Sequence, residues 1–152
     1  MQAQTRIQIG NEIWLTEQAA LDEYPLEKLI LEKLISAKVI RAMAHSTSRL
    51  LAEKDMQVVA PKLDRAQWQD LGRSSINLTD AAQKYQMSAG TLRSLARKGY
   101  VTIVEDRGWQ VLVNEGDVAF AAALAKIIRL SPGKSLFPRN YRPPSSGHTS
   151  SS

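Results

Sequence analysis

Small polar and basic side chains alternate with apolar ones between residues 88 and 98 of this sequence. Leu92, Leu95 and Ala96 are spaced at i, i+3 and i+4, which predicts a helix that buries these three residues. Hydroxyl and guanidinium groups on the opposite face can bond to phosphates and to base edges in the DNA major groove. The stretch therefore predicts a helix that contacts double-stranded DNA. The expected contact residues are Ser88, Gly90, Thr91, Arg93, Ser94, Arg97 and Lys98.

The expected contacts differ along this helix. Arg93 is the best candidate for a base contact, because a guanidinium can pair with guanine O6 and N7 together. Thr91 and Ser94 are expected at either a base or a phosphate. Arg97 and Lys98 lie towards the far end, where we expect phosphate contacts that position the protein without specifying sequence.

The start of the helix is suited to close approach. Ser88 is the expected N-cap, and the small Gly90 lets the helix end approach the groove floor. The free backbone N–H groups there favour a phosphate. The alternative for any one of these residues is an ordinary solvated helix face.

Elements on both sides would hold this helix in place. The predicted elements are helices at Thr79–Tyr85, Ser88–Lys98 and Glu115–Leu130, with strands at Tyr100–Glu105 and Trp109–Val113. Residues 106–108 form the turn between the strands, where Gly108 suits a positive φ. Arg107, at the tip of this turn, is expected at the DNA backbone or in the minor groove, with a solvated turn charge as the alternative. Trp109 is expected in the core beneath the hairpin, with a platform for base stacking as the alternative. This order predicts a winged helix-turn-helix.

The second half of the chain resembles the DNA-binding domain of the MerR and excisionase group. The resemblance lies in LTDAAQKYQMSAGTLRSLARKGYV, in the turn DRGWQVLV and in the helix start NEGDVAF. It implies that Thr91 and Arg93 read DNA and that Arg107 lies on the wing. A full-length MerR regulator would continue into a long dimerisation helix and an effector domain. Glu115–Leu130 is short, so the resemblance implies a compact regulator without an effector-binding domain.

The two halves of the chain also look related to each other. LTEQAALDEYP (Leu15–Pro25) is similar to LTDAAQKYQMS (Leu78–Ser88), and Thr16 and Thr79 are the expected N-caps. LEKLISAKVIR (Leu31–Arg41) aligns with LRSLARKGYVT (Leu92–Thr102), and MQVVAPKLD with WQVLVNEGD. These matches favour an internal duplication.

The first half is expected to be a scaffold or dimerisation element. Helices are predicted at Thr16–Glu23, Leu26–Ala37 and Asp64–Leu71, with a hairpin over Val39–Ala60. Leu26–Ala37 is too apolar to read a groove, so we expect it to be buried in a core or against another subunit. The predicted fold class is mainly α with small β-hairpins (α+β), built as two tandem winged helix-turn-helix-like modules. The expected organisation is a divergent module at 1–72, a DNA-binding domain at 73–130 and a disordered Pro/Ser-rich basic tail at 131–152.

Composition narrows the classes of function. The 152 residues carry a net charge of +5, and the positive charge is concentrated after residue 72, which indicates an acidic partner. There is no cysteine and only two isolated histidines, so we expect no metal site. No motif indicates a cofactor, and the short helix at Glu115–Leu130 leaves no expected effector-binding domain. No signal peptide or membrane span is predicted, which favours the cytoplasm. No nucleophile pattern or phosphate loop indicates an enzyme.

Three functions remain at this point. The first is a homodimeric transcription regulator, most simply a repressor, that binds a promoter operator. The second is an excisionase-like factor of a mobile element that bends DNA. The third is a protein-interaction adaptor that kept the winged fold without binding DNA.

Overall fold

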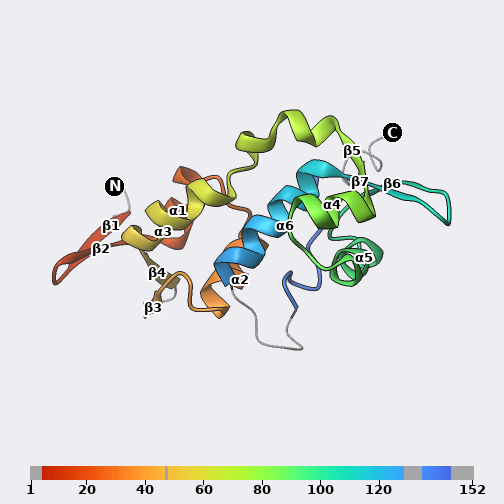
Figure 1. The fold of residues 1–152 in the computed structure, drawn as a ribbon. Coiled ribbons are helices and arrows are strands. Elements are labelled where there is room, and N and C mark those ends of the chain that lie inside the picture. Colours follow the sequence, from red (N-terminus) through yellow and green to blue (C-terminus); the bar gives the residue numbers. More distant parts are fainter. Residues whose placement is uncertain (1–4, 47, 129–134, 145–152) are drawn as a thin grey trace, which may run out of the picture. The chain divides into compact units, whose positions relative to one another are not determined.

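The computed structural model describes residues 5–46, 48–128 and 135–144. It divides into two compact units, Met1–Asp64 (unit 1) and Arg65–Ser152 (unit 2), shown as one ribbon in Figure 1. Both units combine helices with a small antiparallel sheet, which confirms the expected mixed α+β class.

Unit 1 begins with a hairpin that the sequence analysis missed. Its four-stranded antiparallel sheet has the order β1-β2-β4-β3. The elements are β1 (Arg6–Ile9), β2 (Glu12–Thr16), α1 (Glu17–Glu23), α2 (Lys28–Ser36), β3 (Ala42–His45), β4 (Ser48–Ala52), α3 (Glu53–Val59) and the short 3-10 helix η1 (Ala60–Leu63). The expected helices around Thr16–Glu23 and Leu26–Ala37 are confirmed, and Ile30, Leu31 and Leu34 of α2 are buried.

Unit 2 has a three-stranded antiparallel sheet with the order β5-β7-β6. The elements are η2 (Arg65–Trp68), η3 (Asp70–Arg73), β5 (Ser75–Asn77), α4 (Leu78–Lys84), α5 (Ala89–Arg97), β6 (Ile103–Asp106), β7 (Val111–Asn114) and α6 (Glu115–Ile128). The β6–β7 hairpin extends away from the helices of its unit (Figure 1). The end of the expected helix Glu115–Leu130 lies outside the described residues.

The two units repeat one topology. Each contains a strand, two helices, a hairpin and a third helix in the same order, and the strand before the first helix pairs with the second hairpin strand. The same hydrogen bond closes both units. Asp55 Oδ2 accepts from the Arg41 N–H at 2.9 Å in unit 1, and Asp117 Oδ2 accepts from the Thr102 N–H at 2.9 Å in unit 2. The two units therefore share one order of elements and one pattern of strand pairing.

The structure corrects two of the three sequence matches behind that repeat. Thr16 caps α1, but its counterpart is Asn77, whose Oδ1 accepts from the Thr79 N–H at 2.8 Å. The expected N-cap at Thr79 is therefore wrong. Met56 lies in α3, whereas Trp109 lies in the turn between β6 and β7, so MQVVAPKLD and WQVLVNEGD are not equivalent.

The first half of the chain departs from its predicted elements after Ala52. The expected hairpin over Val39–Ala60 is shorter, because residues 53–59 form helix α3. Met56 and Val59 of this helix are buried, and their spacing is helical rather than alternating. The single helix expected at Asp64–Leu71 is replaced by the separate 3-10 turns η2 and η3.

The boundary between the two units lies after Asp64, whereas the sequence predicted it after residue 72. Residues 65–73 belong to unit 2, because their side chains pack on α6. The Trp68 ring lies edge-on to Phe120 with ring centroids 6.3 Å apart. Arg65 Nη1 lies 3.1 Å from Asp117 Oδ1.

Part of the expected disordered tail is packed. Phe137 and Tyr141 are fully buried and stack on each other, with ring centroids 4.8 Å apart. Phe137 also stacks on Tyr100, at 5.1 Å. The prediction of a disordered tail is wrong for residues 135–144, because these aromatic rings bury apolar area against unit 2. Residues 131–134 and 145–152 lie outside the described residues.

Candidate nucleic-acid interface

Helices α4 and α5 form a corner whose ends are fixed by side-chain caps. Asn77 caps α4, and Ser88 caps α5 by accepting from the Thr91 N–H at 3.2 Å. Between the helices, Gln86 adopts a positive φ of 56°. The Met87 N–H then donates to the Ala82 carbonyl at 2.9 Å, which closes the turn and orients α5.

The two faces of α5 have opposite character. Leu92, Leu95 and Ala96 are buried, as the spacing predicted. The other face is exposed and carries all the residues expected there, namely Ser88, Gly90, Thr91, Arg93, Ser94, Arg97 and Lys98. The structure thus gathers seven of the eight predicted site residues on one helix face.

The positive charges of this face are not neutralised within the part of the chain that the structure describes. There, Arg93, Arg97 and Lys98 form no ion pair with any carboxylate. Their charge is therefore available to an anionic partner.

A groove of about 250 Å³ separates α5 from the β6–β7 hairpin. Arg93 and Arg97 line one side, and Ile103 and Trp109 line the other. Thr79, at the start of α4, contributes to the same groove. The fold therefore places two arginines of α5 beside the hairpin, while the other predicted site residues lie outside the groove lining.

The hairpin tip is not the cationic element that the sequence suggested. Arg107 is exposed, and its Nε lies 2.9 Å from Glu105 Oε1. This hydrogen bond raises the pKa of Arg107 above its ordinary value. A contact from Arg107 Nη1 to Gln110 Oε1 at 3.3 Å holds the guanidinium further. Arg107 therefore lies at the expected turn, but its guanidinium already bonds to Glu105 and Gln110 of the same hairpin.

The prediction that Trp109 lies in the core is wrong. Its side chain is 82% exposed. Gly108 has the expected positive φ, 81°, and the Arg107 N–H donates to the Gln110 carbonyl at 2.9 Å. These constraints place Trp109 within the turn, where no core lies beneath it.

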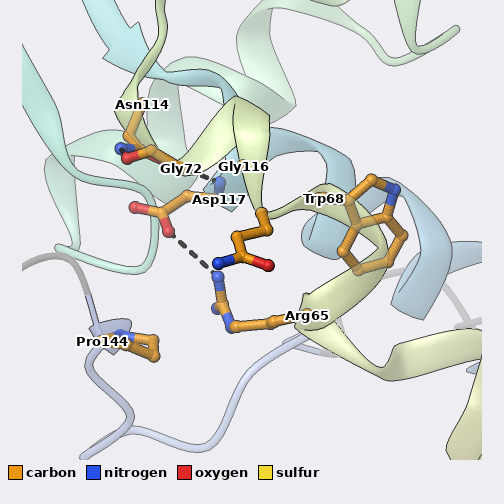
Figure 2. Close-up of a pocket in the computed structure, with 8 residues that line it drawn as sticks. Arg65, Trp68, Gly72, Asn114, Gly116, Asp117 and Pro144 are labelled. Atoms are coloured by element: carbon orange, nitrogen blue, oxygen red, sulfur yellow. Dashed lines mark hydrogen bonds and ion pairs between the residues drawn. The ribbon is translucent and has the colours of Figure 1, made fainter.

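A second cavity, of about 190 Å³, lies at the start of α6. Figure 2 shows the Arg65 side chain pointing to Asp117 across this cavity, with Trp68 and Pro144 at its edges. The Arg65 guanidinium also lies 4.1 Å above the centre of the Phe120 ring. Asp117 is 1% exposed and serves both Arg65 and the Thr102 N–H. These contacts attach the first turns of unit 2 to α6 and give the cavity a structural role.

A buried carboxylate fixes the end of α4. Glu115 accepts hydrogen bonds from Lys84 and from the Tyr85 hydroxyl. Burial alone would raise the pKa of Glu115, but the bonds from Lys84 and Tyr85 outweigh it and lower that pKa below 4.5. Burial, reinforced by Glu115, raises the pKa of Tyr85. The pair ties α4 to α6 and so supports the corner that carries α5.

The described residues contain neither a metal-binding cluster nor a membrane-spanning helix. Among residues 5–46, 48–128 and 135–144, no group of three or more His, Cys, Asp or Glu side chains could hold a metal ion. No helix within those ranges is long and apolar enough to cross a bilayer. No protein-family model, curated protein or solved structure matches the chain.

Proposed function

We propose that unit 2 binds double-stranded DNA with α5 in the major groove, in a winged helix-turn-helix arrangement. The observation that carries the proposal is the exposed face of α5, where three cations form no ion pair within the described residues. An α-helix fits the major groove, and the β6–β7 hairpin takes the position of a wing. The role is binding, without catalysis or a cofactor.

Each residue has a role in this proposal. Arg93 reads a base, most simply guanine through O6 and N7. Thr91 and Ser94 bond to a base or a phosphate, and Arg97 and Lys98 bond to phosphates. Ser88 and Gly90 bring the N-terminal end of α5 to the DNA. The ion pair of Arg107 with Glu105 gives that residue a smaller role than the sequence suggested.

The charge distribution favours DNA over the alternative of a protein adaptor. Unit 2 carries a net charge of +6, whereas unit 1 carries −1. Phosphate neutralisation is the largest source of affinity for most DNA-binding proteins. We further propose that the chain acts as a homodimeric regulator of transcription, most simply a repressor. The resemblance to the MerR and excisionase group supports this role, and a DNA-bending factor is the nearest alternative.

Selection of bound duplexes from a random library, followed by fluorescence anisotropy over a salt series, tests DNA binding. Arg93→Ala should cost about 1–3 kcal/mol of binding free energy and relax preference at one base pair, while Lys98→Ala should weaken all sequences alike. Lys54→Ala, an exposed lysine of unit 1, is the matched control and should change neither. Absence of salt-sensitive DNA binding by the full chain would refute the proposal.

Footprinting on the selected sequences separates the regulatory roles. Protection of a palindrome indicates a dimeric regulator, because the two-fold symmetry of a dimer matches that of its site. Several phased sites with strong bending indicate the architectural role instead.

A further inference from the structure

The exposed indole of Trp109 has no role in the fold of unit 2. Complete exposure of an aromatic ring forgoes the burial that normally stabilises it, and Trp109 is 82% exposed. The same ring lines the groove that contains Arg93 and Arg97. An apolar surface therefore lies directly beside the two cations that the proposed function assigns to DNA.

The surroundings of Trp109 on the hairpin are acidic and apolar rather than basic. Glu105 and Asp106 precede the turn, and Arg107 is the only cation among residues 103–111. That cation is paired with Glu105. Phosphate contacts at this tip are disfavoured, because the segment carries a net charge of −1. Any contact of the hairpin with DNA must therefore be made through uncharged groups.

We propose that Trp109 lies against the deoxyribose and base edges of the bound duplex, beside the segment that α5 reads. This inference rests on the proposed function and names the group through which the wing contributes. Charge complementarity favours this occupant, because Arg93 and Arg97 outnumber the one acidic residue of the groove lining, Asp106, and attract a polyanion, while the indole meets its uncharged sugar and base surfaces. An aromatic ring that packs against such surfaces buries apolar area.

Affinity measured at several salt concentrations distinguishes this contact from a phosphate contact. Trp109→Ala should raise the Kd of the full chain for its selected duplex about tenfold at every salt concentration. The slope of log K against log salt should not change, because no phosphate is neutralised by an indole. Arg97→Ala should instead flatten that slope by about one phosphate contact.

Two variants serve as controls. Val104→Ala removes another exposed apolar side chain of the same hairpin, 54% exposed and outside the groove lining, and should leave the Kd unchanged. Trp109→Phe keeps a ring and should retain part of the affinity. Equal thermal unfolding midpoints for all variants would show that the fold is intact, as expected for exposed turn positions.

A second readout follows the indole itself. Of the three tryptophans, Trp14 is buried, Trp68 is half-buried against Phe120 and Trp109 is exposed. Acrylamide quenching of the full chain should therefore fall when the duplex covers Trp109. Trp109→Phe should abolish that protection.

Three results would overturn the inference. If Trp109→Ala binds like Val104→Ala while Arg93→Ala fails, the DNA-binding function stands and Trp109 serves another partner. If Trp109→Ala changes the salt slope as Arg97→Ala does, the contact is electrostatic and not the one proposed. If the full chain binds no duplex at low salt, the proposed function fails and this contact fails with it.

Discussion

Arg93 in unit 2 and Glu32 in unit 1 are both the fifth residue of a nine-residue helix, α5 and α2 respectively. The two helices have the same length and end before equivalent positive-φ residues, Lys38 in unit 1 and Gly99 in unit 2, although only α5 has a side-chain N-cap, Ser88. The backbone at the two positions is therefore the same, and the side chains have opposite charge. A shared scaffold does not imply a shared function, because function depends on the side chains at the site.

The arginines of unit 1 show how far this difference extends. Arg6, Arg41 and Arg49 each pair with two carboxylates. Arg49, for example, pairs with Glu17 at 3.0 Å and with Glu32. Such partly exposed pairs add little stability, but they cancel the charge that a phosphate would need. The arginines of unit 1 are therefore neutralised, whereas Arg93 and Arg97 of α5 form no ion pair within the described residues.

The largest expected effect on stability comes from removing the aspartate that accepts the closing hydrogen bond in each unit, Asp117 in unit 2 and Asp55 in unit 1. Asp117→Ala leaves the Arg65 guanidinium without its buried carboxylate and should cost about 3 kcal/mol of unfolding free energy. Asp55→Ala, the equivalent change in unit 1, affects the more exposed pair with Arg41 and should cost about 1 kcal/mol. Urea unfolding of both variants measures the difference. Equal losses of unfolding free energy would show that Asp117 and Asp55 stabilise their units to the same extent, despite the deeper burial of Asp117.

Exchange of the charge that separates the units should have the next largest effect. Arg93→Glu gives α5 the residue of α2 and should weaken DNA binding about a hundredfold, which is close to 3 kcal/mol. Glu32→Gln in unit 1 is the matched control and should leave affinity unchanged. Anisotropy titrations at fixed salt measure both. Undiminished binding by Arg93→Glu would place the interface elsewhere.

The surface of α5 could be predicted because its causes are local. The spacing of Leu92, Leu95 and Ala96 and the cap at Ser88 lie within one short segment. The N-terminal hairpin also has a local signal in the sequence, namely alternating Ile7 and Ile9 before a glycine and an asparagine.

Trp109 and Asp117 could not be placed from local patterns. Tryptophan is usually buried, but the hairpin turn leaves Trp109 exposed, and only the fold shows this. Asp117 bonds to Arg65 and Thr102, which are distant in sequence. The repeat does leave a trace, because Glu-Xaa-Asp begins both α3 and α6, at Glu53 and Glu115.

Alanine at the second position of α6 and of α3 should have smaller and unequal effects on stability. A Cβ on Gly116 would lie 3.1 Å from Gly72 Cα and 3.2 Å from its backbone nitrogen, so neither atom can yield by a rotamer change. Gly116→Ala should therefore cost about 1–2 kcal/mol, although alanine is the better helix former. The equivalent residue of unit 1 is the exposed Lys54, and Lys54→Ala should change stability by less than about 0.5 kcal/mol. A higher unfolding midpoint for Gly116→Ala would show that the backbone at Gly72 moves aside.

The smallest expected effect concerns the paired glutamates at the start of α6 and α3. The pKa of Glu115 is lowered in the folded state, so its ionisation stabilises unit 2 above the unfolded value of 4.5 and this contribution is lost as the pH falls below that value. Glu115→Gln should cost about 1 kcal/mol at neutral pH and should flatten the loss of stability on acidification. Glu53, its counterpart, shares Arg6 with Glu23, whereas Glu115 is more deeply buried and also accepts from the Tyr85 hydroxyl. Glu53→Gln should therefore cost less. Urea midpoints between pH 3 and pH 7 measure both variants. A pH profile of Glu115→Gln that matches the wild type would show that other carboxylates dominate the acid response. The contacts of Glu115 with Lys84 and Tyr85 would then be no stronger than the contact of Glu53 with Arg6.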